Sequence, residues 1–146
     1  MSALVSIITP SYNSARFIND CVNSVFEQTY TNWELIIVDD ASYDNSKELI
    51  SDIAATDNRI KFVFLTENIG VAGARNIALE KSKGRYIAFL DSDDVWKKEK
   101  LTKQIHFMQS YDISFSFSSY EPMSENGVKI FKEIKAPLKI DYNSLL

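Results

Sequence analysis

The sequence predicts an α/β fold, with a mostly parallel sheet flanked by helices. Four short apolar runs, rich in β-branched and aromatic residues, are typical of strands. Between them, apolar residues recur every three or four positions, which is typical of amphipathic helices. Strands that alternate with helices build a parallel sheet through right-handed crossovers. The expected strands are 4–9, 33–38, 60–65 and 86–90, and the expected helices lie near 17–26, 46–53, 71–82 and 101–108.

Local signals set the bounds of several of these elements. Pro10 is expected to end the first strand, because proline cannot donate a hydrogen bond to a ladder. Ser46 is expected to cap the second helix, and Gly84 to stop the third. The run Tyr86–Leu90 is expected to be buried on both faces, as strands of a helix-covered parallel sheet are.

Further along the chain the pattern changes. Ile113–Ser118 alternates apolar residues with serine at a period of two, which predicts a half-buried strand. Pro122–Gly127 is expected to be a turn, and Val128–Phe131 is a candidate short strand. Asp141 is expected to cap a further helix.

Composition excludes several classes of protein. A net charge of −4 leaves no basic footprint for nucleic acid. One cysteine, Cys21, excludes an internal disulfide, and one histidine, His106, excludes a site with several histidine ligands. No apolar run approaches the ~20 residues of a transmembrane helix. We therefore expect a soluble cytoplasmic protein of one domain.

Polar residues gather where the four expected strands end. They are Pro10–Asn13, Asp39 and Asp40, Thr66–Asn68, and Asp91–Asp94. The carboxyl ends of parallel strands meet at one edge of a sheet, and in open α/β sheets ligands bind there. Packing alone does not call for this pattern, so it predicts a binding site.

Three carboxylates within four positions give that edge its chemistry. Asp91, Asp93 and Asp94 repel one another, so one of them is expected to hold a proton or to share a cation. Mg²⁺ or Mn²⁺ would suit one or two carboxylates together with phosphate oxygens. The glycine-rich signatures of dinucleotide sites and of phosphate-binding loops are absent. The pattern favours a nucleotide diphosphate held through a carboxylate-bound metal, and the alternative is a solvated acidic loop that caps the next helix.

Four stretches, taken in order, resemble family 2 glycosyltransferases. They are Val5–Asn13, Ser24–Tyr30, Trp33–Ser42 and Asn68–Asn76. Asp91-Ser92-Asp93 resembles that family's metal-binding Asp-x-Asp. The resemblance covers residues 4 to about 110 and fades beyond Tyr111.

This resemblance implies the GT-A fold and the transfer of a sugar, with inversion, from a nucleotide-diphosphate sugar. The family's usual donor is a UDP-sugar. The acceptor would be a hydroxyl of a saccharide or lipid-linked molecule, in polysaccharide or glycoconjugate synthesis at the inner face of the membrane. The implied cofactor is Mn²⁺ or Mg²⁺, held by Asp91 and Asp93. The implied donor-binding residues are Thr9, Pro10, Tyr12, Asn13, Asp39, Asp40, Arg75, Asp91, Ser92 and Asp93.

The resemblance gives some of these residues particular roles. Tyr12 would stack near the base, and Asp40 would accept a hydrogen bond from a base N–H, with Asp39 the weaker candidate of the pair. Arg75 would lie near the ribose and phosphates. A salt bridge from Arg75 to a strand-end acid is an equally open interpretation.

The general base is the one part that the sequence does not supply. In the family it lies well beyond the Asp-x-Asp, and none of the later acids stands in a similar motif. We therefore assign no catalytic residue and expect the base beyond residue 146. Residues 1–146 would then be a single donor-binding domain that ends before the acceptor region. Apolar surface at Ile140, Leu145 and Leu146 would favour self-association into a homo-oligomer.

Two other functions stay open at this stage. The first is a module that binds a nucleotide sugar without turning it over. The second is a haloacid-dehalogenase-like phosphatase, suggested by Asp91–Val95.

Overall fold

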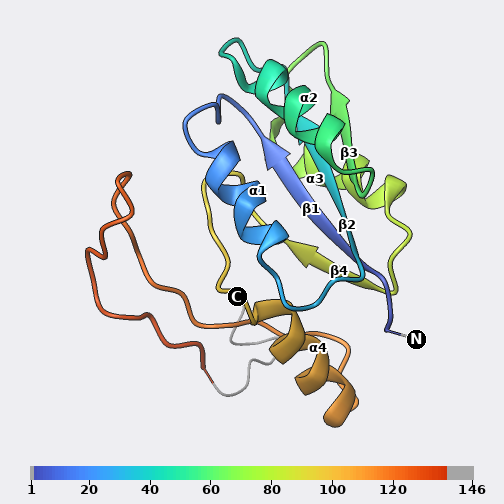
Figure 1. Ribbon diagram of the computed structural model, residues 1–146, viewed down its shortest axis with the longest axis vertical. Helices are drawn as coiled ribbons and strands as arrows, with labels where there is room; N and C mark the ends of the chain where they lie inside the picture. The colour runs from blue at the N-terminus through green and yellow to red at the C-terminus, as the bar shows by residue number, and fades with distance from the viewer. Residues whose placement is uncertain (1, 138–146) are drawn as a thin grey trace. The chain divides into compact units, whose positions relative to one another are not determined.

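The computed structural model describes residues 2–137 (Figure 1). The chain divides into two compact units, residues 1–103 and 104–146. The first unit contains a four-stranded parallel sheet in the order β3-β2-β1-β4. The elements are β1 Val5–Ser11, α1 Ile18–Phe26, β2 Trp33–Asp39, α2 Ser46–Thr56, β3 Ile60–Phe64, α3 Gly70–Lys81, β4 Tyr86–Phe89 and α4 Lys100–Ser110. The predicted α/β class and the alternation of strands with helices are confirmed.

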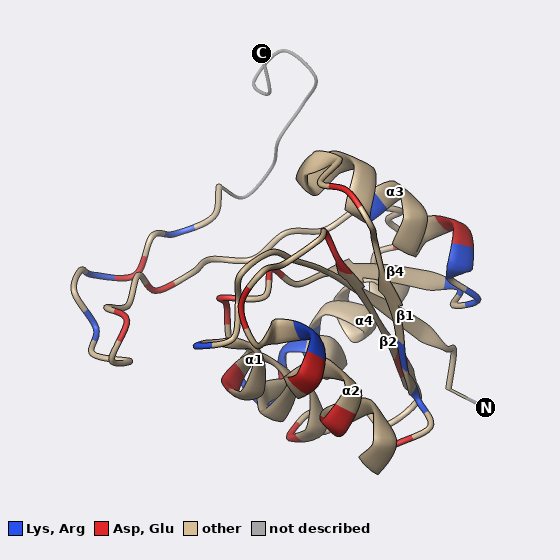
Figure 2. Cartoon of the chain, turned by 90° about the horizontal axis from the view of Figure 1, so that it is seen from above, with Lys and Arg blue, Asp and Glu red and all other residues tan. Residues whose placement is uncertain are grey.

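Helices cover both faces of the sheet, with α1 and α2 on one face and α3 on the other (Figure 1). Side chains alternate between the faces of a strand, so β1 and β2, which are buried along their whole length, feed both layers. On the α3 side the core is built from Ile8, Ile36 and Val38, which pack against Ala74 and Ala78. Small residues at these two helical positions let α3 lie close to the sheet. Few charged residues lie on the strands. Most of the charged residues lie on the helices and loops (Figure 2).

The strand order reverses at β1. The chain runs outward from β1 through β2 to β3, and then returns to place β4 on the other side of β1. The loops that follow β1 and β4 therefore leave the sheet in different directions. The crevice between such loops is where α/β sheets bind ligands.

Pro10 does not end β1, contrary to the expectation from sequence. The strand continues to Ser11, with Pro10 paired to Val38 of β2. In a parallel strand, successive residues direct their backbone groups to opposite neighbours. Ile8 faces β4, since its carbonyl accepts a hydrogen bond from Leu90 N–H at 3.0 Å, so Pro10 faces the same side. Pro10 has no N–H to donate toward β4, but β4 has already ended at Phe89, so the ladder loses no hydrogen bond there.

The strand β4 is not buried on both faces, as its sequence had suggested. Its residues alternate between half-buried and exposed, and Ile87 and Phe89 are 39% and 52% exposed. The reason is its position at the edge of the sheet. An apolar run shows that a strand has affinity for a core, but it cannot show whether a neighbouring element covers it.

The strand predicted at Ile113–Ser118 does not form, and the short strand at Val128–Phe131 is reduced to one bridging residue, Lys129. A strand needs a hydrogen-bonded partner, and the described residues offer none to Ile113–Ser118. The turn before Gly127 is present, closed by a 2.9 Å hydrogen bond from Gly127 N–H to the Ser124 carbonyl. The helix expected at Asp141 lies outside the described residues.

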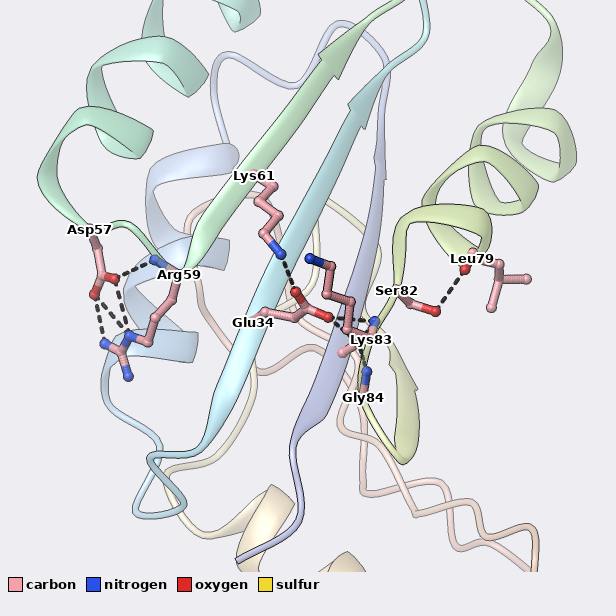
Figure 3. Close-up of polar contacts among 9 residues, drawn as sticks. Glu34, Asp57, Arg59, Lys61, Leu79, Ser82, Lys83 and Gly84 are labelled. Carbon is pink, nitrogen blue, oxygen red and sulfur yellow. Dashed lines mark hydrogen bonds and ion pairs between the residues drawn. The ribbon is translucent and has the colours of Figure 1, made fainter.

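A buried carboxylate joins three strands at the edge opposite the strands' carboxyl ends (Figure 3). Glu34 of β2 accepts hydrogen bonds from Ser6 Oγ at 2.6 Å, from Lys83 N–H at 2.7 Å and from Lys61 Nζ. Gly84 donates to the same Ser6 Oγ at 2.8 Å. A Cβ on Gly84 would lie 2.5 Å from the Ser6 nitrogen, so only glycine permits this approach. The network fixes the start of β4 against β1.

Replacing Glu34 tests this network. Burial alone would raise the pKa of Glu34, but hydrogen bonds from Lys61, Ser6 and the Lys83 amide outweigh it and lower the pKa below the ordinary 4.5. The ionised group therefore contributes stability above its ordinary pKa, and this contribution is lost as the pH falls through the lowered value. We expect Glu34→Gln to reduce the free energy of unfolding at pH 7 by about 2 kcal/mol.

Urea unfolding at pH 7 and at acid pH measures the effect. The loss of stability on acidification should be smaller in Glu34→Gln than in the parent. A matched control is Glu99→Gln, which removes an exposed carboxylate that also pairs with a lysine, Lys103. Equal behaviour of the two variants would contradict the structural role of Glu34.

Candidate functional site

A pocket of about 370 Å³ opens at the carboxyl edge of the sheet, at the β1–β4 reversal. It is lined by four segments: the end of β1, the residue after β2, the start of α3 with the loop before it, and the loop after β4. Six of the residues predicted from sequence are among its walls: Pro10, Tyr12, Asp40, Asp91, Ser92 and Asp93. The other lining residues are Ser11, Asn68, Gly70, Val71 and Ala74.

Asp40 holds the first turn of α3 at one side of the pocket. Its two carboxylate oxygens accept hydrogen bonds from Ile69 N–H at 2.8 Å and Gly70 N–H at 2.9 Å. Asn68 donates to the Asp40 carbonyl at 3.1 Å. These first amides of a helix have no partner within it, and a carboxylate there also complements the helix dipole. Asp40 is therefore the cap of α3, supplied from the end of β2.

Asp39, the neighbouring acid, faces away from the pocket walls. It is fully buried, and its carboxylate accepts hydrogen bonds from both the backbone N–H and the hydroxyl of Ser42. It organises the loop that follows β2. Thr9 is likewise fully buried in β1 and does not line the pocket. Among the described residues, the Thr9 hydroxyl has no hydrogen-bond partner.

Asn13 ties the loop after β1 to the loop after β2. Its N–H donates to Ser42 Oγ at 2.8 Å, and its side-chain oxygen accepts from Tyr43 N–H at 3.1 Å. Two further bonds follow, from Ser14 N–H to Ser46 Oγ at 2.9 Å and from Ala15 N–H to Asp44 at 3.1 Å. Ser46, predicted as a cap, is instead the buried first residue of α2. Asn13 thus supports the pocket wall that Tyr12 provides.

Arg75 pairs with Asp91, which is the salt bridge that the sequence left open. The guanidinium Nη2 of this α3 residue lies 2.6 Å from Asp91 Oδ1. Both side chains are partly exposed, at 35% and 45%. The pair joins α3 to the loop after β4, and within residues 2–137 the second carboxylate oxygen of Asp91 makes no hydrogen bond or ion pair.

The other two acids of the loop lack such compensation. Asp93 is exposed and lines the pocket, and within residues 2–137 its carboxylate makes no hydrogen bond or ion pair. Partial burial, followed by the charges of Asp93 and Asp91, raises the pKa of Asp94. Beneath the loop, burial and then the three carboxylates raise the pKa of the Cys21 thiol to about 12. Cys21 is therefore a neutral core thiol.

The carboxylate oxygens of this loop suit a hard divalent cation that takes only one or two of its ligands from the protein. The described residues contain no group of three or more His, Cys, Asp or Glu side chains arranged to hold a metal by themselves. Mg²⁺ and Mn²⁺ usually coordinate one or two carboxylates and complete their shell with water and phosphate oxygens. The two pocket carboxylates Asp91 and Asp93, of which Asp93 has no counter-ion among the described residues, fit this preference.

The sequence located the site but missed part of its wall. Asn68 was among the polar residues predicted at the strand ends, but it was not predicted to bind the donor, because nothing in its motif marked it as more than a loop residue. Val71 and Ala74 line the pocket through their place on the first turns of α3. Tyr43, which lies outside the pocket wall and contacts Tyr12, was not singled out either, since an exposed aromatic residue in a loop carries no periodic signal.

The parallel sheet, with its strand-order reversal at β1 and its flanking helices, has the GT-A fold of the solved glycosyltransferase structures that it resembles. The model of glycosyl transferase family 2 matches residues 6–142. The chain belongs to that family, and the resemblance seen in the sequence is confirmed.

One curated relative and two solved structures illustrate the similarity. The Escherichia coli protein UDP-Glc:alpha-D-GlcNAc-diphosphoundecaprenol beta-1,3-glucosyltransferase WfgD is 47% identical over 98% of this chain and 55% of its own length. S. aureus TarS, solved with UDP-GlcNAc, is 32% identical, with a TM-score of 0.69 over 74% of this chain and 32% of TarS. The mannosyltransferase PcManGT from Pyrobaculum calidifontis, solved with GDP-Man and Mn²⁺, is 29% identical, with a TM-score of 0.67 over 71% of this chain and 32% of its own.

The chain spans about half the length of the curated relatives it matches, 57% and 55% for two of them. Among residues 2–137, no helix has both the length and the apolar character needed to cross a membrane.

Asp40 offers a direct test of the capping geometry. Asp40→Ala should lower the free energy of unfolding by about 2 kcal/mol, because Ile69 N–H loses its acceptor and Gly70 N–H keeps only the longer bond to Asn68 Oδ1 at 3.2 Å. Asp93→Ala is the matched control, since it removes an acid from the same pocket that caps nothing. Urea unfolding compares the two variants with the parent. Equal stability of Asp40→Ala and Asp93→Ala would show that Asp40 does not hold α3.

Proposed function

We propose that this chain binds the nucleoside diphosphate part of a nucleotide-sugar donor and belongs to a glycosyltransferase of polysaccharide or glycoconjugate synthesis. The observation that carries the proposal is the composition of the pocket. An exposed aromatic ring, Tyr12, and a carboxylate, Asp40, stand on one side, and the acids Asp91 and Asp93 stand on the other. A planar base and a charged diphosphate, joined by a ribose, match such a pocket.

Each residue has a role that follows from its position. The exposed ring of Tyr12 offers a face on which a base can stack. Asp40 would accept a hydrogen bond from a base N–H through lone pairs that the α3 amides leave free, since a carboxylate has about four acceptor sites. Arg75 would direct Asp91 toward the pocket through their ion pair, near the ribose and phosphates.

Asp91 and Asp93 would hold Mn²⁺ or Mg²⁺ together with the diphosphate oxygens. When bound, the cation neutralises the negative charge that gathers on the diphosphate as the sugar leaves. Burial, followed by the charges of Asp93 and Asp91, raises the pKa of Asp94, and the part of this shift that comes from repulsion supports the assignment. PcManGT, whose solved complex contains Mn²⁺, supports it as well.

A UDP-sugar is the donor that we propose, because TarS was solved with UDP-GlcNAc and WfgD is named for UDP-Glc. The name of WfgD also supports a lipid-linked saccharide as the acceptor, and an acceptor of this kind would bring the protein to the inner face of the membrane. Transfer would proceed with inversion. Membership of the glycosyltransferase family decides against the phosphatase alternative.

We further propose that the general base comes from the part of the relatives that this chain does not match. Every acid that lines the pocket already has a role, either as the cap of α3 or in donor binding. Residues 1–146 by themselves would then act as a donor-binding module without turnover. Steady release of UDP coupled to glycosylation of an added acceptor, by this chain alone, would refute that.

Isothermal titration calorimetry with UDP tests the site. Without a cation, the diphosphate meets two carboxylates, of which only Asp91 has a counter-ion among the described residues, so removing Mn²⁺ with EDTA should weaken UDP binding at least about tenfold. Equal UDP affinity in EDTA and in Mn²⁺ would refute the proposed metal-assisted site.

Asp93→Ala tests the assignment of the metal ligand. We expect this variant to lose the Mn²⁺-dependent part of UDP binding while its melting temperature stays equal or rises slightly, because a repulsive charge is removed from an exposed loop. Asp94→Ala is the matched control, since it removes the same charge from a residue that does not line the pocket. If Asp93→Ala binds UDP and Mn²⁺ as the parent does, Asp93 is not a ligand.

A further inference from the structure

Two tyrosines at the rim of the pocket pack on each other. The rings of Tyr12 and Tyr43 have centroids 6.2 Å apart and planes at 84°, which is an edge-to-face contact. Tyr12 is 49% exposed and Tyr43 is 82% exposed. Neither ring belongs to the core, so the stability of the fold does not account for the pair. Tyr12 lines the pocket, whereas Tyr43 does not line it and contacts Tyr12.

The backbone beneath this pair is held unusually firmly for a surface region. The loops after β1 and β2 are joined by the hydrogen bonds of Asn13, Ser14 and Ala15 described above. One of these bonds connects the two tyrosines' neighbourhoods directly, since Tyr43 N–H donates to the Asn13 side chain. The bond places Tyr43 beside the residue that follows Tyr12.

Two residues next to the tyrosines adopt left-handed backbone conformations. Asn13 has φ of 50° and Ala41 has φ of 60°. This conformation is costly for alanine in particular, and such strain persists only where the surrounding structure fixes it. Here the cross-linked loops supply that constraint. The tyrosine side chains therefore project from a rigid base, and only their side-chain torsions remain to be set.

We propose that Tyr43 is a positioning residue for the nucleobase, which acts by fixing the ring of Tyr12. The edge of one ring against the face of the other restricts the Tyr12 torsions. The free face of Tyr12 is then presented to the base before the donor arrives. Binding no longer has to order that side chain, which is the usual origin of gains from preorganisation. This inference rests on the proposed nucleotide site and adds a residue outside the pocket wall to it.

The test is a double-substitution cycle measured by calorimetry in Mn²⁺ with two ligands, UDP and inorganic pyrophosphate. Pyrophosphate offers the charges of the diphosphate without a base. Tyr43→Ala should raise the Kd for UDP by about 2- to 12-fold, the range expected for an aromatic pair, and leave the Kd for pyrophosphate unchanged. Tyr43→Phe keeps the ring and should restore the parent affinity for UDP.

The Tyr12→Ala background separates positioning from direct contact. There, adding Tyr43→Ala should change the UDP Kd by less than about twofold, because the ring that Tyr43 positions is already gone. A full-sized further loss in that background would overturn the proposal, and so would an equal loss for pyrophosphate or no effect of Tyr43→Ala alone. Unchanged melting temperatures confirm that the variants are folded.

Failure of the underlying site has a different signature. If the parent chain binds neither UDP nor pyrophosphate in Mn²⁺, the proposed function is wrong and Tyr43 has no base to serve. If the parent binds UDP and the cycle shows no coupling between the tyrosines, only the role of Tyr43 is wrong.

Discussion

The pocket depends on where the hydrogen-bond ladder between β1 and β4 ends. Pro10 faces β4 and has no N–H to offer, so the ladder closes with the bond from Leu90 to Ile8. On its other side, β1 continues to pair with β2 as far as Ser11, whose carbonyl accepts from Asp40 N–H at 2.8 Å. At its end β1 is therefore still hydrogen-bonded to β2 but no longer to the chain that follows β4. The loop from Asp91 leaves the sheet while Asp40 stays attached to it, and the pocket opens between them.

The acids at this edge divide into two groups by what already satisfies them. Asp39 and Asp40 accept hydrogen bonds from loop and helix amides, and their charge is part of the fold. Asp91 is paired with Arg75, while Asp93 and Asp94 have no such partner among the described residues; burial, and then the charges of Asp93 and Asp91, raise the pKa of Asp94. Of the first group Asp40 lines the pocket and would bind a ligand through its spare lone pairs, and of the second group Asp91 and Asp93 line it and would bind through excess negative charge. A ligand with a polar base and a cation-bound diphosphate uses both.

The sequence predicted those features that depend on local pattern. Apolar runs and helical spacing gave the strands, the helices and the class of fold, and the position of Asp39, Asp40 and Asp91 to Asp94 after strands placed them at one edge. Features that depend on a distant partner were not predictable. Ile113–Ser118 has the alternation of a strand but no neighbour to pair with, and Phe89 has the composition of a core residue but sits on an edge. Likewise, no pattern indicates that Asp39 directs its carboxylate to Ser42 while Asp40 directs its own to α3.

Asp40 shows why the fold and the site cannot be separated at this edge. The hydrogen bonds from α3 fix the orientation of the Asp40 carboxylate. A nucleobase that donates to the same carboxylate would therefore find its acceptor already oriented. The same helix also bears Arg75, which pairs with Asp91. The position of α3 therefore sets how far the Asp40 carboxylate lies from the loop after β4. Tyr12 is held in a comparable way, by loops cross-linked through Asn13. The parts that would bind the base are therefore preorganised by the folded chain, whereas the acidic loop keeps an unbalanced negative charge that a bound cation would neutralise.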